Sequence, residues 1–425
     1  MTPESGPSAP YADPHRAKAD AMSLDDLLAY FERHLSGRKV GIVIEYTVRR
    51  LGKLAEPKAV DLAVNELSRS GTGGPGGPRA ARLLQLARAE RAVPALVACL
   101  RGEHGACLPG GTVRANDPRH AVIEALGWIG SPDALRALVW AAVEWQGATG
   151  PRPSGRMRPA CKECGQYLAE ALCRSPTPES VDALLGMTRR MDRLWSERTL
   201  SAVARVADER FVPFFVELCA GPARDVGLTG LRRTATDRAV PALLHILAAA
   251  PDRRTRDRAA QALATAVSAD DRAWGRGWWA WSPDPTRRHP DPRVRRSMAW
   301  VAGRAAHPAD GAVRDLRESL RDPDDLVRAQ AVASLGLIVR DLVPPTSYLP
   351  DQDPQTLLLR ALDDPCYRVR ARAATAVGRL NLRREADEMH LRHAARYDPV
   401  RCVRDAAEAA LRARYHPVRK APPGE

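Results

Sequence analysis

The chain has little lysine, few aromatic residues and no long apolar run. Only six of its 65 basic residues are lysines, and the arginine excess accompanies many Ala, Gly and Pro residues, a mixture typical of GC-rich coding sequence. The longest apolar run, residues 40–48, contains Glu45 and is far shorter than the roughly 20 residues of a membrane span. The first residues are rich in Pro, Ser and Ala and lack the apolar core of a signal peptide. We therefore expect a cytoplasmic protein that does not enter a membrane.

Cysteine is also sparse, with eight residues scattered along 425 positions. Most occupy sites where a small buried apolar residue fits, such as Cys99 and Cys219, which favours reduced thiols over a disulfide framework. The net charge of +14 permits an acidic partner, either nucleic acid or an acidic protein surface. A hydrophobic content of 44% is enough to bury a core, which excludes a disordered polymer.

Internal repeats dominate the sequence. Three segments share one pattern: DPDDLVRAQAVASLGLI (322–338), DPCYRVRARAATAVGRL (364–380) and DPVRCVRDAAEAALRAR (398–414). Their first aspartates are candidate N-caps of a helix, with proline at the next position. A second half-motif places apolar residues at offsets 0, 3, 4 and 7, as in Val240, Leu243, Leu244 and Leu247. Each unit is therefore predicted to be two helices, with one face of the second helix buried against the neighbouring unit.

The repeat organises most of the chain. Matching anchor positions recur near residues 52, 85, 127, 173, 204, 232, 264, 303, 336, 378 and 412. Before them, residues 23–35 are predicted to form a capping helix that begins with Ser23 and Asp26 as a capping box. We expect a solenoid over residues 23–415 between tails at 1–22 and 416–425. A Gly/Pro linker is predicted at 70–78, and inserted loops are predicted at 101–117, 146–160, 270–290 and 340–354.

These DPxxxVRxxAAxALGxxxxxxAVPAL units resemble HEAT repeats of the short bacterial type, often called phycobilisome-lyase-like. The resemblance covers roughly residues 40–415. It implies an all-α fold, an α-solenoid or superhelix of about eleven HEAT-like helix pairs, in which the second helices line a concave binding face. Known members include lyases that attach cofactors, DNA glycosylases, a di-iron hydroxylase and plain scaffolds, so the resemblance does not select a function.

Two groups of arginines can be separated by their position in the repeat. Arg328, Arg370 and Arg404 stand six residues after the first aspartate of their unit. Arg295 and Arg256 stand four residues after theirs. Recurrence in successive copies predicts a ladder in which each arginine pairs with an aspartate of its own or the next unit.

The second helices supply a further set of candidate contacts. Their outward rows, read at fixed offsets through the units, form no basic stripe, which counts against a nucleic acid duplex held in the groove. The rows instead carry mixed polar and aromatic residues that suit a protein partner. The candidate partner-binding residues here are Trp140, Trp145 and His245.

A Trp-rich insertion at residues 270–290 is the most unusual segment of the chain. Tryptophan beside arginine is typical of binding hot spots and of single-stranded nucleic acid sites. The alternative interpretation is a loop that folds back and fills a gap in the solenoid. The candidate partner-binding residues of this region are Trp274, Arg276, Trp278, Trp279, Trp281, Arg287, Arg288, Arg295 and Arg296.

A metal site is a further hypothesis. Cys161 and Cys164 form a C-x-x-C-G motif, and His104 and Cys107 have a similar spacing. Both pairs lie in or beside inserted loops of neighbouring units, so together they are candidate ligands of a structural zinc ion. Against this interpretation, Cys161 and Cys164 also fall where a first helix is predicted to begin.

The residues give less support to an enzymatic function. The hydroxylase of this superfamily carries His-Glu pairs, and the chain has none. No glycosylase or lyase motif can be matched residue by residue, so we assign no catalytic residue and no small-molecule substrate. We expect a non-catalytic scaffold that binds a protein, without a cofactor other than the hypothetical zinc. A nucleic-acid-binding protein and a lyase-like cofactor-attachment factor are the alternatives.

Overall fold

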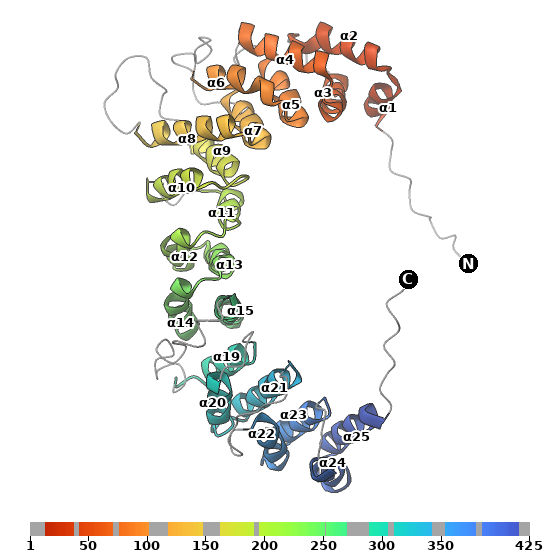
Figure 1. Cartoon of the computed structure of the whole chain (residues 1–425), viewed down its shortest axis with the longest axis vertical. Coiled ribbons are helices and arrows are strands. Elements are labelled where there is room, and N and C mark those ends of the chain that lie inside the picture. The colour runs from red at the N-terminus through yellow and green to blue at the C-terminus, as the bar shows by residue number, and fades with distance from the viewer. Residues whose placement is uncertain are drawn as a thin grey trace, which may run out of the picture. The chain divides into compact units, whose positions relative to one another are not determined.

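The computed structural model describes the chain in eleven stretches, and all regular structure in them is helical (Figure 1). The described residues are 13–37, 42–70, 76–101, 118–147, 162–190, 195–250, 252–269, 289–304, 310–341, 353–379 and 385–415. Contacts divide the chain into two compact units, residues 1–206 and 207–425, and each is described by itself. The described stretches contain 22 α-helices and four 3-10 helices, which are Glu90–Ala92, Glu209–Phe211, Asp237–Ala239 and Ala361–Asp363.

Unit 1 consists of two packed layers of helices. The first-helix layer contains α1 (Pro14–Ala21), α3 (Ile42–Leu54), α5 (Gly77–Ala87), α7 (Pro118–Ile129), α9 (Lys162–Leu172) and α11 (Glu197–Val203). The second-helix layer contains α2 (Leu24–Leu35), α4 (Pro57–Ser70), α6 (Val93–Arg101), α8 (Pro132–Gly147) and α10 (Pro178–Arg190). Consecutive first helices pack against one another, and second helices pack against flanking first helices, as α4 does against α5 and α8 does against α7 and α9.

Unit 2 continues the same two-layer plan. Its first-helix layer contains α13 (Arg224–Thr234), α15 (Arg253–Ala269), α19 (Pro292–Ala302), α21 (Asp325–Asp341), α23 (Tyr367–Val377) and α25 (Arg401–Tyr415). Its second-helix layer contains α12 (Val212–Cys219), α14 (Val240–Ala249), α20 (Asp310–Ser319), α22 (Pro354–Arg360) and α24 (Glu385–Tyr397). The structure thus confirms an all-α solenoid. The eleven anchor positions of the repeat all lie in the C-terminal half of a first helix or directly after it, from α3 to α25.

The N-terminal region is partly helical, which corrects the prediction of a tail at residues 1–22. Asp13 accepts a hydrogen bond from the His15 amide at 2.9 Å and caps α1. The Nη1 atom of Arg50 donates to the carbonyls of Ala19 and Met22 at 2.6 and 3.0 Å, which ties the C-terminal end of that helix to α3. The next helix, α2, begins as predicted, because Ser23 accepts a bond from the Asp26 amide.

Part of the predicted Gly/Pro linker at 70–78 is also ordered and buried. Gly77 begins α5 and is buried together with Gly76. A Cβ atom at Gly76 would lie 2.5 Å from Oε1 of the buried Glu66, so the glycine is needed for close approach to α4. Arg79, in the first turn of α5, donates to the carbonyls of His34 and Leu35 at 2.9 and 3.2 Å. The residues of the linker and of the inserted loops between the described stretches lie outside the described part of the chain.

The arginine ladder forms in part of unit 2, where Arg295, Arg328 and Arg370 each pair with an aspartate of the next repeat. Arg256 and Arg404, which were also predicted to belong to it, donate to backbone carbonyls. Arg328 donates from Nε and Nη2 to the two carboxylate oxygens of Asp364, at 2.8 and 3.0 Å. Its Nη1 donates to the carbonyl of Asp322 in its own unit at 2.9 Å. The same bidentate pair joins Arg370 to Asp398 at 2.7 and 3.0 Å. One guanidinium group therefore fixes two consecutive turns, and a charge-assisted bidentate pair is among the stronger polar contacts.

The ladder explains why the predicted N-cap assignment of these aspartates is wrong. α23 begins at Tyr367, three residues after Asp364, and α25 begins at Arg401, three residues after Asp398. Each aspartate instead accepts the amide two residues later, from Cys366 and Val400, at 2.8 Å. The aspartate therefore holds the turn before the helix, and its carboxylate oxygens also accept from the arginine of the preceding repeat.

Adjacent first helices approach closely at the small residues of the repeat. A Cβ atom built on Gly303 would lie 2.4 Å from the Cβ atom of Ser334 in α21. We expect Gly303→Ala to lower the free energy of unfolding by about 1–3 kcal/mol, because the helices would have to separate. Gly221→Ala is the matched control, since its Cβ would meet the nearest atom at 3.7 Å. Urea denaturation tests this, and equal stability of the two variants would contradict the close packing.

No helix among the described residues has both the length and the apolar character needed to cross a membrane.

Candidate functional site

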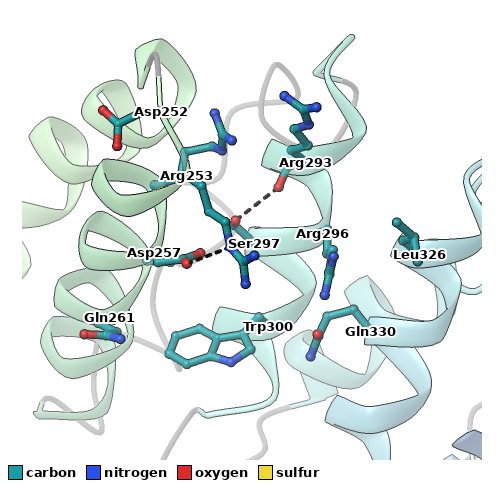
Figure 2. A pocket seen from close by; sticks show the side chains of 12 residues that line it. Asp252, Arg253, Asp257, Gln261, Arg293, Arg296, Ser297, Trp300, Leu326 and Gln330 are labelled. Carbon is teal, nitrogen blue, oxygen red and sulfur yellow. Dashed lines mark hydrogen bonds and ion pairs between the residues drawn. The ribbon is translucent and has the colours of Figure 1, made fainter.

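A pocket of about 750 Å³ opens on the first-helix layer of unit 2, between α15, α19 and α21. Its volume lies in the range of about 300–1,000 Å³ that is usual for ligand sites. Figure 2 shows the Trp300 ring in α19, with Gln261 of α15 on one side and Gln330 of α21 on the other. The twelve lining residues are Asp252, Arg253, Arg256, Asp257, Ala260, Gln261, Arg293, Arg296, Ser297, Trp300, Leu326 and Gln330.

α19 forms the middle of the pocket because its lining residues share one helical face. Arg293, Arg296, Ser297 and Trp300 stand at offsets 0, 3, 4 and 7. The Ser297 hydroxyl donates to the carbonyl of Arg293 at 3.1 Å, so it is satisfied within the helix. The guanidinium of Arg304 lies 3.7 Å from the centroid of the Trp300 ring. This cation–π contact holds the indole against the helix surface.

α15 forms one wall, and its two carboxylates are engaged in local contacts. Asp252 accepts from the amide and the hydroxyl of Thr255, each at 2.8 Å. Those hydrogen bonds keep the pKa of Asp252 below its usual value. Asp257 pairs with Arg253 one helical turn earlier, with the Nε and Oδ2 atoms 3.4 Å apart. Arg256, which is nearly buried, donates to the carbonyl of Ala250 at 3.1 Å.

α21 forms the opposite wall with residues of a different character. Leu326 is 37% exposed, and Gln330 donates from Nε2 to the hydroxyl of Ser334 at 3.4 Å. Arg372 of α23 reaches over this helix and donates to the carbonyl of Ala329 at 3.2 Å. Burial lowers the pKa of Arg372, and the positive charge of Arg296 lowers it further. The positive charge of Arg296 on α19 therefore acts on Arg372 of α23.

The lining can bind a ligand, but it holds no pair of groups poised for acid–base or nucleophilic chemistry. Neither histidine nor cysteine is among the lining residues, and both carboxylates are held by neighbours. A general acid or base needs a pKa near the working pH, whereas that of Asp252 is lowered. The amides of Gln261 and Gln330, the indole of Trp300 and the guanidinium groups offer hydrogen bonds, apolar area and positive charge.

The structure separates the arginines and tryptophans that the sequence grouped together. Trp274, Arg276, Trp278, Trp279, Trp281, Arg287 and Arg288 lie outside the described residues. Arg295 is a rung of the ladder, since it donates to both carboxylate oxygens of Asp322 at 2.7 and 2.9 Å with 13% of its side chain exposed. It is therefore engaged within the chain, which corrects its selection as a partner contact. Arg296, the next residue, lines the pocket.

The candidates on the second helices lie apart from this pocket. Trp140 of α8 is partly buried, with the guanidinium of Arg101 at 5.4 Å from its ring centroid. Trp145 also belongs to α8, and its side chain is outside the described part of the structure. His245 is exposed on α14. The described pocket is on the first-helix layer, whereas these three residues are on second helices.

Only one of the four predicted zinc ligands lies among the described residues. Cys161, His104 and Cys107 fall outside them. The buried Cys164 places its Sγ atom 3.3 Å from Nε2 of His120, whose ring stacks on Tyr167 at 4.2 Å. In the stretches that the structure describes, no three His, Cys, Asp or Glu side chains are grouped to hold a metal ion.

Trp300 and Gln261 were missed by reasoning from the sequence. That reasoning followed the outward rows of the second helices, whereas these residues occupy one row of the first helices. Trp300 and Gln261 both stand five residues after an arginine at the ladder position, Arg295 and Arg256 respectively. A comparison of the residue at this position in successive repeats would have found them.

Comparison with known proteins identifies the repeat. Residues 286–347, which include α19 and α21, match the family of HEAT repeats. No curated protein matches the chain. A solved structure of a Kap121p mutant is 13% identical, with a TM-score of 0.50, covering 93% of this chain and 50% of that one. Importin beta is 14% identical over 93% of this chain and 58% of its own, with a TM-score of 0.49. An engineered protein is 19% identical over 83% and 98%, with a TM-score of 0.38.

The chain spans about half the length of the Kap121p chain that it matches. At 13% identity the likeness shows the fold alone, and it agrees with the helix pairs described above. The family match covers HEAT repeats in general, and the same two-helix unit and ladder extend beyond the matched residues. Residues 286–347 therefore match HEAT repeats, and the described helix pairs have the fold of an α-solenoid.

Proposed function

We propose that the chain is a non-catalytic scaffold that binds a partner protein on the first-helix layer of unit 2, around the pocket between α15, α19 and α21. The composition of the pocket wall carries this proposal. Trp300 and the exposed Leu326 supply apolar area beside Arg293 and Arg296, which form no ion pair with another described residue. Tryptophan and arginine dominate the residues whose truncation weakens protein interfaces most.

The solenoid architecture supports the same proposal. Among the described residues, the main contacts of each helix are with its own and adjacent helix pairs. Such an open array can bind a partner along a row of first helices. Interfaces are apolar at the centre and polar at the rim, and the pocket has this arrangement, with Trp300 between Gln261 and Gln330. We retain the tryptophans of residues 274–281 as further proposed contacts, because in the sequence they lie between α15 and α19.

Truncating the indole tests the docking surface. We expect Trp300→Ala to reduce the amount of partner protein that co-purifies with the tagged chain by about tenfold or more, because a central tryptophan is a typical hot spot. Leu326→Asp, at an exposed site, is a second variant that places a charge in the same surface without emptying a packed position. His245→Ala, on the second-helix layer, is the control. Circular dichroism verifies that each variant is folded.

The outcomes separate the alternatives. Loss of the same partner from both pocket variants, with the partner retained by His245→Ala, supports the proposal. Retention by folded pocket variants and loss from His245→Ala would assign docking to the second helices instead. If nuclease treatment removes all bound material, the chain binds nucleic acid rather than protein.

A further inference from the structure

We infer that the element of the partner that occupies this pocket is an acidic peptide segment, with carboxylates on Arg293, Arg296 and Arg372 and an apolar side chain on Trp300. The inference rests on the proposed function, and it names the chemistry of the partner. It draws on the charge balance of the pocket, on the arginines of α19 and α23 beside α21, and on the apolar area of the lining.

Positive charge exceeds negative charge in the pocket. Arg253 and Asp257 compensate each other, and Asp252 is held by Thr255. Arg293 and Arg296 have no carboxylate partner among the described residues, and Arg296 is only partly exposed. Guanidinium groups bind carboxylates through paired hydrogen bonds, so an acidic segment would supply the missing acceptors.

Arg372 supplies a further guanidinium group near Arg296. It comes from α23 and is anchored on the Ala329 carbonyl of α21, the helix that α19 and α23 both contact. Burial lowers the pKa of Arg372, and the positive charge of Arg296 lowers it further. A carboxylate that reaches both guanidinium groups would replace this repulsion with attractive contacts.

The helix N-termini beside the pocket add little to this charge. The N-terminal end of a helix carries partial positive charge, but α15, α19 and α21 are each capped by an aspartate, namely Asp252, Asp291 and Asp324. The guanidinium groups therefore carry the positive charge of the pocket.

The apolar and acidic parts of the lining favour a peptide over a nucleic acid. Single-stranded nucleic acids bind by stacking successive bases on several aromatic rings. Trp300 is the one aromatic residue lining the described pocket, and Arg304 already stacks on its ring at 3.7 Å. A peptide can direct its backbone amides toward Asp252 and Asp257 at the rim, and a phosphate backbone has no such donors.

Fluorescence anisotropy with the full chain tests the inference. The probe is a labelled peptide of alternating Asp, Leu and Glu residues. The comparison ligands are the matching peptide of Asn, Leu and Gln and a single-stranded oligothymidylate. We expect the acidic peptide to bind at least about tenfold more tightly than the neutral one, with an affinity that falls as salt rises.

The variants assign the binding to the pocket. R293Q/R296Q should weaken the acidic peptide by about tenfold or more, because two charge-assisted contacts are lost. R401Q/R412Q removes the same charge from exposed residues of α25 in the same layer, and should change binding by less than about twofold. Glutamine keeps side-chain volume at exposed or partly exposed sites, so both variants should remain folded, which circular dichroism verifies.

Four results would overturn the inference: undetectable binding of the acidic peptide, equal binding of the neutral peptide, equal loss in the two double variants, or tighter binding of oligothymidylate that depends on Arg293 and Arg296. These outcomes are distinct from failure of the proposed function. If Trp300→Ala still loses its partner while the acidic peptide does not bind, the docking surface stands and the acidic chemistry is wrong.

Discussion

Replacing Asp364 by alanine is expected to lower the free energy of unfolding of unit 2 by about 3 kcal/mol, because the change leaves a shielded guanidinium without its carboxylate. Arg328 and Asp364 are 13% and 11% exposed, so water replaces the lost contacts poorly. The hydrogen bond with Asp364 also raises the pKa of Arg328. The same carboxylate holds the Cys366 amide, so the turn before α23 loses its support as well.

Asp363 is the matched control because it is the preceding residue, has the same side chain and is exposed. Asp363→Ala should change stability by less than about 0.5 kcal/mol. Urea denaturation followed by circular dichroism measures both. R328M/D364A should be less destabilised than the sum of its single variants, because the pair is then removed together. Equal stability of Asp363→Ala and Asp364→Ala would refute a structural role for the ladder.

Phe215→Ala is expected to cost about 3–5 kcal/mol, the range for truncating a fully buried phenylalanine. Phe215 lies in α12, is fully buried, and packs on α13 where a Cβ atom at Gly230 would come within 2.5 Å of its ring. The absence of a side chain at Gly230 thus makes room for the ring. Removing the ring leaves a cavity that the two helices cannot close without shifting.

The adjacent Phe214 is the control for this prediction, since it is only partly buried in the same helix. In thermal unfolding, the midpoint temperature of Phe214→Ala should be well above that of Phe215→Ala. The reverse order would mean that α12 presents its other face to α13. A smaller ring-to-aliphatic change, Phe215→Leu, should recover part of the loss, because it refills part of the cavity.

The repeat made the architecture predictable. Anchor positions at regular spacing located eleven of the twelve described first helices, α3 to α25, and recurring arginines located the ladder, since both reflect contacts between successive repeats. Helix starts were less predictable. Asp364 has the residue type of an N-cap, but its carboxylate serves the arginine of the preceding unit, so α23 starts three residues later.

The pocket was harder to predict because helices from three different repeats form it. Trp300 sits in the segment SMAWVAG, where its neighbours Ala299 and Val301 are buried, so the sequence resembles an ordinary core stretch. Only the helical phase places the indole on the outward face of α19. The pocket forms between helices that belong to different repeats, so no local sequence pattern around Gln261 or Gln330 predicts it.

The most direct test of the docking surface is site-specific photo-crosslinking with a benzophenone amino acid placed at Gln261 or at His245. Both residues are exposed, and they lie on different layers of unit 2, on α15 and α14. The account predicts that Gln261 yields a covalent adduct with a partner protein and that the adduct is lost when R293Q/R296Q is added. An adduct from His245 alone would contradict it and place the partner on the second helices.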